Sequence, residues 1–109
     1  MRNLNTFKKQ EEFQTVFQLR DSAADKNMVI YRAPGSGRIG IICSKKVGNS
    51  VVRHRFQRTV REAYRLHRSD LKDDVDIVII ARESAKGQGF FEIEHSFLNL
   101  AKKLSILKY

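Results

Sequence analysis

Residues 75 to 82, VDIVIIAR, constrain the fold more than any other stretch of this chain. Apolar residues follow one another almost without interruption, whereas a strand with one wet face alternates apolar and polar residues. The run is also far shorter than the roughly 18 to 20 apolar residues that a membrane helix needs. It therefore predicts a central β-strand that is covered on both faces.

Two further strands are predicted before it. Residues 27 to 33 and 38 to 44 are rich in β-branched residues, and the sequence PGSG lies between them. Proline and glycine suit a tight turn between antiparallel strands. We therefore expect these two segments to pair as a β-hairpin.

Amphipathic helices are predicted at both ends of the chain. Residues 9 to 20 place Phe13, Val16 and Phe17 at helical spacing. A second helix is expected from about Phe91, with acidic residues early and lysines late, as the helix dipole favours. Its apolar positions are Ile93, Phe97, Leu100, Leu104 and Leu107. With 109 residues and no linker or repeat, the chain is expected to form one α+β domain spanning residues 1–109.

The positive charge of the chain is concentrated in one segment. The net charge is +9, and residues 45 to 68 hold eight Lys or Arg against a single acid, Glu62, which gives this segment +7. A concentrated positive segment on a nearly neutral body is typical of proteins that bind a polyanion.

Plotted as a helix from Ser50 to about Arg68, this segment has one apolar and one basic side. Asn49 and Ser50 are candidates for the N-cap. The apolar stripe comprises Val52, Phe56, Thr59, Ala63 and Leu66, with Val60 and His67 at its margin. The opposite side comprises His54, Gln57, Arg58, Arg61, Arg65 and Arg68, with Arg53 and Arg55 on the flanks.

A solvated helix face is the plainer interpretation of this charge. Such faces usually interleave both signs, but here the pair Arg58 and Glu62 is the one favourable pair at i, i+4 that the spacing offers. Arginines that repel one another cost stability, and arginine suits the binding of phosphate. We therefore favour a nucleic-acid partner.

The remaining candidate chemistry is sparse. His54, His67 and His95 are dispersed, and the acids Asp70, Asp73, Asp74 and Asp76 fit a charged loop and strand entry better than a metal site. No metal site and no catalytic residue is predicted. The lone Cys43 in an apolar run indicates a reducing compartment, and no signal sequence or membrane span is present, so we expect a cytoplasmic protein.

The stretch KKVGNSVVRHRFQRTVREAYR resembles the signature of the protein component of bacterial ribonuclease P. The segments FKKQEEFQTVF, MVIYRA and DIVIIARESA are also similar to segments of that family, in the same order. The resemblance implies a two-layer α/β sandwich in which the terminal helices and the basic helix lie on a mixed sheet. It also implies an unusual left-handed βαβ crossover.

The resemblance further implies a function. The chain would bind the catalytic RNA of ribonuclease P and precursor tRNA, and would assist removal of the 5′ leader while the RNA performs the chemistry with Mg²⁺. No membrane and no obligate protein partner are implied. The RNA-binding positions would be Lys45, Lys46, Asn49, Arg53, His54, Arg55, Arg58, Arg61 and Arg65. The leader would lie against Phe13, Phe17, Val29 and Tyr31.

Two positions depart from the family pattern, and other functions stay open. His54 stands where the family commonly has Asn, and Gln57 where it commonly has Lys.

Phe13 and Phe17 also fit a simple role in the core. A general structural RNA-binding protein, such as a ribosomal protein, would carry a similar basic helix. A DNA-binding regulator fits less well, because no helix precedes the basic helix at short turn spacing.

Overall fold

The computed structural model describes residue 14 and residues 21 to 108, and the predicted helix over residues 9 to 20 lies outside them apart from Gln14. Within residues 21 to 108, two α-helices and two short 3-10 helices accompany four strands. The strands are β1 (Ser22–Ala24), β2 (Met28–Pro34), β3 (Ile39–Ile42) and β4 (Val75–Ala81). The helices are α2 (Ser50–Leu66), η1 (Arg68–Asp70), η2 (Glu83–Ala85) and α3 (Phe90–Lys103).

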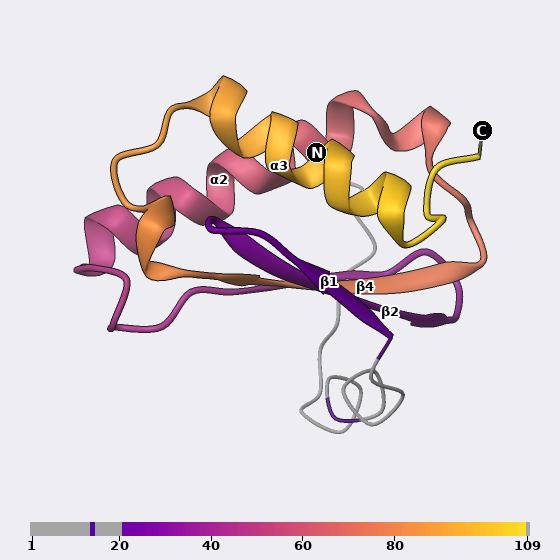
Figure 1. Ribbon diagram of the computed structural model, residues 1–109, viewed down its shortest axis with the longest axis horizontal. Helices are drawn as coiled ribbons and strands as arrows, with labels where there is room; N and C mark the ends of the chain where they lie inside the picture. The colour runs from indigo at the N-terminus through magenta and orange to yellow at the C-terminus, as the bar shows by residue number, and fades with distance from the viewer. Residues whose placement is uncertain (1–13, 15–20, 109) are drawn as a thin grey trace.

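The four strands form one mixed sheet in the order β1-β2-β4-β3. Strand β2 is antiparallel to β4, from Met28 opposite Ala81 to Pro34 opposite Val75. Strand β3 is parallel to β4, and α2 connects these two neighbours. Helices α2 and α3 lie on the same face of the sheet, which gives the molecule its two layers (Figure 1). The handedness of the β3–α2–β4 crossover stays a prediction.

Strand β4 is the central strand that the apolar run predicted. Ile77 and Ile79 belong to the main core beneath the two helices, whereas Val78 packs with Ala33 on the opposite face. Because successive side chains of a strand point to opposite faces, a strand buried on both faces must be apolar at nearly every position. Asp76 is the exception, and its carboxylate organises the neighbouring turn.

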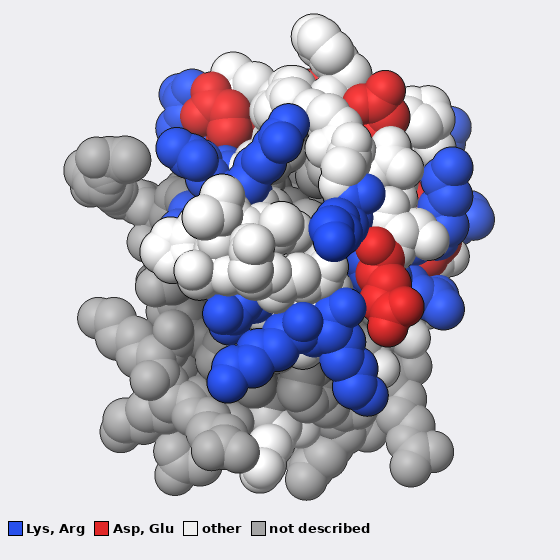
Figure 2. Space-filling model, turned by 90° about the vertical axis from the view of Figure 1, so that its left-hand side faces the viewer, with Lys and Arg blue, Asp and Glu red and all other residues white. Residues whose placement is uncertain are grey.

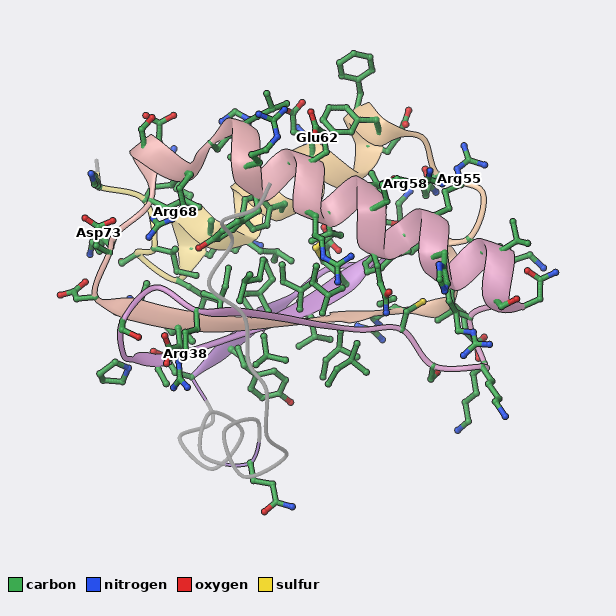
Figure 3. The ribbon with its side chains drawn as sticks, turned by 180° about the vertical axis from the view of Figure 1, so that it is seen from behind. Arg38, Arg55, Arg58, Glu62, Arg68 and Asp73 are labelled. Carbon is green, nitrogen blue, oxygen red and sulfur yellow. The ribbon has the colours of Figure 1, made fainter. Side chains whose placement is uncertain are left out.

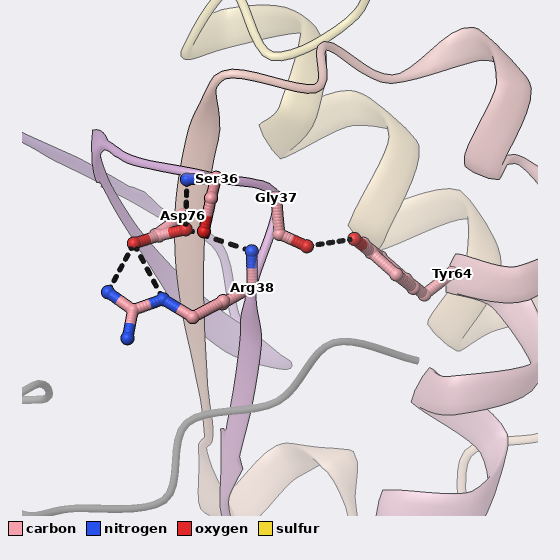
Figure 4. A network of polar contacts seen from close by, with 5 residues as sticks. All are labelled: Ser36, Gly37, Arg38, Tyr64 and Asp76. Carbon is pink, nitrogen blue, oxygen red and sulfur yellow. Dashed lines mark hydrogen bonds and ion pairs between the residues drawn. The ribbon is translucent and has the colours of Figure 1, made fainter. Parts of the chain in front are cut away.

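The predicted hairpin between β2 and β3 is wrong, because β4 lies between the two strands. The connecting residues 35 to 38 cross the beginning of β4, where the Asp76 carboxylate accepts hydrogen bonds from the backbone N–H groups of Ser36 and Arg38 at 3.0 and 2.8 Å (Figure 4). A Cβ at position 35 would lie 2.1 Å from the Asp76 carboxylate, so only glycine fits there. The turn was therefore predicted correctly, but its crossing of β4 to the far side of that strand was not.

Helix α3 confirms the predicted C-terminal helix, although it ends sooner than its apolar spacing indicated. The helix stops at Lys103, and Ser105 adopts a positive φ of 57° that ends the helical path. Leu107 instead forms an isolated antiparallel bridge with Leu71. Ile93, Phe97 and Leu100 are buried as predicted.

The two helices contact each other as well as the sheet. The rings of Tyr64 and Phe97 meet edge to face, with 6.4 Å between their centroids. The His67 Nε2 lies 2.8 Å from the Glu94 Oε2 atom, which joins the end of α2 to α3. Among the described residues, no helix is long and apolar enough to cross a membrane.

Candidate nucleic-acid interface

Helix α2 begins where the sequence predicted. The Asn49 side-chain oxygen accepts a hydrogen bond from the Val52 backbone N–H at 3.0 Å, which identifies Asn49 as the N-cap. A Cβ at position 48 would lie 2.7 Å from the Val52 side chain, so Gly48 allows the loop to pass close to the first turn. The start of the basic helix is thus held in place by its own loop.

The buried side of α2 is rotated relative to the predicted stripe. Phe56, Val60, Ala63 and Tyr64 are buried, whereas Leu66 is 51% exposed. Leu66 was therefore wrongly assigned to the buried face and Tyr64 was missed. The Tyr64 hydroxyl donates a hydrogen bond to the Gly37 carbonyl oxygen at 3.2 Å, so the polar tip of the ring is satisfied although the ring is buried. The spacing of Val60 and Tyr64 at i, i+4 was the available signal.

The opposite side of α2 presents the predicted basic residues to solvent. The side chains of His54, Arg55, Arg58, Arg61 and Arg65 are exposed, and those of Gln57 and Arg53 are half-buried. Lys45 and Lys46 are exposed in the loop before the helix. Figure 2 looks onto the end of the molecule where α2 begins, and Lys and Arg side chains crowd this face.

Two arginines near the other end of α2 have carboxylate partners. Arg65 donates two hydrogen bonds to Glu62, from Nε at 3.2 Å and from Nη2 at 2.6 Å. The predicted pair of Arg58 and Glu62 is therefore wrong. Arg68 lies 3.2 Å from the Asp73 carboxylate and 5.6 Å from the centre of the Tyr64 ring.

The basic residues nearer the start of α2 differ from these. Within the part of the chain that the structure describes, none of them forms an ion pair with a carboxylate. They are Lys45, Lys46, Arg53, Arg55, Arg58 and Arg61. Charges of one sign held together without internal counterions attract anions from solution. We call this surface the basic end of α2, and the described carboxylates leave its positive charge without ion pairs.

Arg53 occupies a different place from its neighbours. Its side chain is half-buried, and its Nε atom is buried without a hydrogen-bond partner among the described residues. Cys43 lies close by on the sheet side. Burial raises the pKa of the Cys43 thiol, and the positive charge of Arg53 opposes that shift. Arg53 thus extends the basic end of α2 towards the edge of the sheet.

An open hollow of about 540 Å³ lies beside the loop that precedes α2, where β3 and β4 end. Lys46 and Ser44 line one side, and residues 81 to 84 line another. Asp25 and Glu83 also line it, so this hollow carries charges of both signs. It is less suited to phosphate than the outer face of α2.

Two of the four predicted leader-binding residues, Val29 and Tyr31, lie on the other side of the sheet. Tyr31 packs beside Ala33 and Val78 on the face opposite the helices. Val29 shares that face because it lies two residues from Tyr31 along β2. Phe13 and Phe17 lie outside the described residues. The structure therefore separates the sheet face of Val29 and Tyr31 from the outer face of α2.

The acidic residues after α2 do not converge on one point. Asp73 contacts Arg68, and the buried Asp76 carboxylate contacts the Arg38 guanidinium at 2.8 Å. Burial alone would raise the pKa of Asp76, but hydrogen bonds from Arg38 and Ser36 outweigh it and hold that pKa below its ordinary value. Among the described residues, no group of three His, Cys, Asp or Glu side chains could hold a metal ion.

Comparison with known proteins identifies the family. The family model described as Ribonuclease P matches residues 1–105. The chain belongs to the ribonuclease P protein family. It is 42% identical to the ribonuclease P protein component of Brevibacillus brevis over 112 residues, which cover 99% of this chain and 89% of that protein. It is 41% identical to the one from Alkaliphilus metalliredigens, over 98% of this chain and 99% of that protein.

Solved ribonuclease P proteins have the same fold. The protein from Staphylococcus aureus superimposes with a TM-score of 0.85 at 30% identity, covering 97% of this chain and all of that one. The protein from Thermotoga maritima, at 24% identity and a TM-score of 0.82, shares the fold over 91% of this chain and 96% of its own length. The α+β architecture and the family expected from the sequence are both confirmed.

Proposed function

We propose that this chain binds the catalytic RNA of ribonuclease P through the basic end of α2 and assists cleavage of the 5′ leader from precursor tRNA. Membership of the ribonuclease P family implies a role in tRNA 5′ processing together with RNA. The contact surface and the two RNA partners are our inference. The observation that carries it is a row of arginines that have no carboxylate partner within residues 21 to 108. They lie on one side of a helix whose other side is buried.

The physical support for this surface is its rigidity as well as its charge. Phe56 and Val60 anchor α2 in the core, so the backbone beneath Arg55, Arg58 and Arg61 is fixed. Guanidinium groups present planar forks that match phosphate oxygens, and their binding releases counterions from the nucleic acid. We assign Asn49 to shaping the turn that carries Lys45 and Lys46, and His54 to the rim of the contact.

The second part of the proposal concerns the leader. An unpaired strand of variable sequence is bound best by aromatic stacking, because every base has a flat face. Tyr31, with Val29 beside it, supplies such a surface on the sheet face opposite α2. Phe13 and Phe17 are proposed to complete it. The two sheet faces would thus serve two RNA strands, the catalytic RNA at the helix side and the leader at the other.

The chemistry in this proposal belongs to the RNA. The Mg²⁺ ions that such a reaction needs would be held by the RNA, and we assign no residue of this chain to them. The contribution of the protein is to bring the two RNAs together and to offset their mutual repulsion. The isolated chain would have no nuclease activity, and the complex would act in the cytoplasm.

Reconstitution tests the proposal. The chain is combined with a ribonuclease P catalytic RNA at low Mg²⁺, and cleavage of precursor tRNA is followed over time. We expect faster cleavage with the protein than with the RNA alone, and no cleavage by the protein alone. If the chain bound unrelated folded RNAs equally well and left the cleavage rate unchanged, a general structural RNA-binding role would replace this one.

A further inference from the structure

The arginines from Arg55 to Arg68, which run along α2 and into η1, fall into two groups. Arg55, Arg58 and Arg61 have no carboxylate partner among the described residues, whereas Arg65 is paired with Glu62 and Arg68 is paired with Asp73. Figure 3 shows this order, with Arg55 and Arg58 towards one end of the helix and Arg68 with Asp73 at the other. The change from one group to the other occurs at Glu62.

Glu62 uses the part of Arg65 that would otherwise bind phosphate. Its two oxygens accept hydrogen bonds from Nε and Nη2, which form one edge of the guanidinium fork. Both side chains are about half exposed, so neither is held by the core and the pair lies on the same outer surface as Arg58 and Arg61. The hydrogen bonds from Arg65 also hold the pKa of Glu62 below its ordinary value, so this carboxylate is charged at neutral pH.

We propose that Glu62 ends the RNA-contact surface of α2, by occupying the fork of Arg65 and by placing a negative charge next to Arg61 on the path of the phosphate backbone. This inference rests on the proposed function. RNA phosphates would contact the helix from its start to Arg61 and would turn away before Arg65. Glu62 therefore determines which of the arginines on the outer side of α2 contact RNA.

Phosphate cannot simply displace the glutamate. An exposed ion pair is weak, so a phosphate could compete for Arg65 if the carboxylate moved away freely. Glu62 is tethered one helical turn from Arg65, however, so the displaced carboxylate would remain beside the incoming phosphate and would repel it. Both outcomes disfavour a contact at Arg65, although the sequence alone predicts one.

The test is the salt dependence of binding to the catalytic RNA, measured for the full chain and its variants. Replacing Glu62 by Gln keeps the size of the side chain and removes its charge. We expect E62Q to bind more tightly and to steepen the slope of log K against log salt by about 0.7 to 0.9, the value of one added phosphate contact. We expect R65A to leave the wild-type slope unchanged, and E62Q/R65A to return to it.

Two controls separate this inference from simpler explanations. E92Q removes the charge of an exposed carboxylate that lies on α3 rather than on α2. If E92Q steepened the salt slope as much as E62Q, net charge alone would be responsible. A loss of slope in R65A as large as that in R61A, or an unchanged slope in E62Q, would overturn the inference. If R58A/R61A left the slope unchanged, the proposed function itself would fail. If that variant flattened the slope while E62Q did nothing, only the role of Glu62 would fail.

Discussion

The Tyr64 hydroxyl donates a hydrogen bond to the Gly37 carbonyl oxygen, and this contact joins the basic helix to the turn that crosses β4 (Figure 4). The same turn is held by the Asp76 carboxylate through Ser36 and Arg38. Gly37 itself has a positive φ of 86°, a conformation that favours glycine. The orientation of α2 therefore depends on a polar network as well as on apolar packing.

Replacing Tyr64 by Phe tests this link. The ring stays buried, but the Gly37 carbonyl oxygen loses its partner, so we expect a loss of about 1 kcal/mol in the free energy of unfolding. Denaturant unfolding measures it. Binding to RNA should be unchanged once the variant is folded, because Tyr64 lies on the buried side of α2. A variant as stable as wild type would show that the hydrogen bond contributes nothing net.

Acid should weaken the network around Asp76. The pKa of this carboxyl is lowered in the folded state, so its contribution to stability is fully present above the pKa of the unfolded chain, about 3.9, and is lost as the pH falls through the lower folded value. D76N should cost roughly 2 kcal/mol or more at neutral pH, because hydrogen bonds to a charged acceptor are lost. Its stability should also depend less on pH below 4 than that of wild type. The exposed Asp74 supplies the control, and D74N should leave the free energy of unfolding at neutral pH unchanged.

The buried side of α2 differs from the predicted apolar stripe, and this difference can be tested with two variants. F56A should destabilise the fold by about 3 to 5 kcal/mol, because a fully packed ring is removed. L66A should change stability by no more than about 0.5 kcal/mol, because Leu66 is more than half exposed. Thermal or denaturant unfolding of the two variants side by side decides this. Equal losses would mean that Leu66 is buried in solution.

The cap of α2 can be removed without touching a charge. N49A deletes the oxygen that accepts the Val52 N–H, and we expect a loss of about 1 kcal/mol in stability. Amide hydrogen exchange should increase most at the first turn of α2. If exchange rose equally over the whole protein, the cap would not be a local feature of this helix.

Much of this fold follows from the sequence, and the failures have identifiable causes. The apolar run of β4 predicted a central strand. Local sequence does not determine which strands flank a central strand, so the position of β4 between β2 and β3 was missed. Tyr64 was not counted as apolar. A helical plot contains no information on tertiary contacts, so it could not predict that the Gly37 carbonyl oxygen accepts a hydrogen bond from the Tyr64 hydroxyl. Long-range contacts of this kind are set by tertiary structure rather than by periodicity.

Among the charged residues, too, some features follow from local spacing and others depend on tertiary structure. The basic side of α2 was predictable from spacing alone. The partner of Glu62 was not, because both Arg58 and Arg65 lie one turn away. The structure selects Arg65, and this agrees with the general preference for an acid that lies N-terminal to its basic partner on a helix. The three-dimensional structure thus decides which arginines lack a carboxylate partner among the residues that it describes.

The most direct test of the central claim is the salt dependence of RNA binding by R58A/R61A, compared with K102A/K103A. Both variants lose two exposed positive charges, but Lys102 and Lys103 lie at the end of α3. The account predicts that R58A/R61A flattens the slope of log K against log salt by about 1.4 to 1.8, two phosphate contacts, and that the lysine variant leaves it nearly unchanged. Equal slopes in the two variants would contradict it.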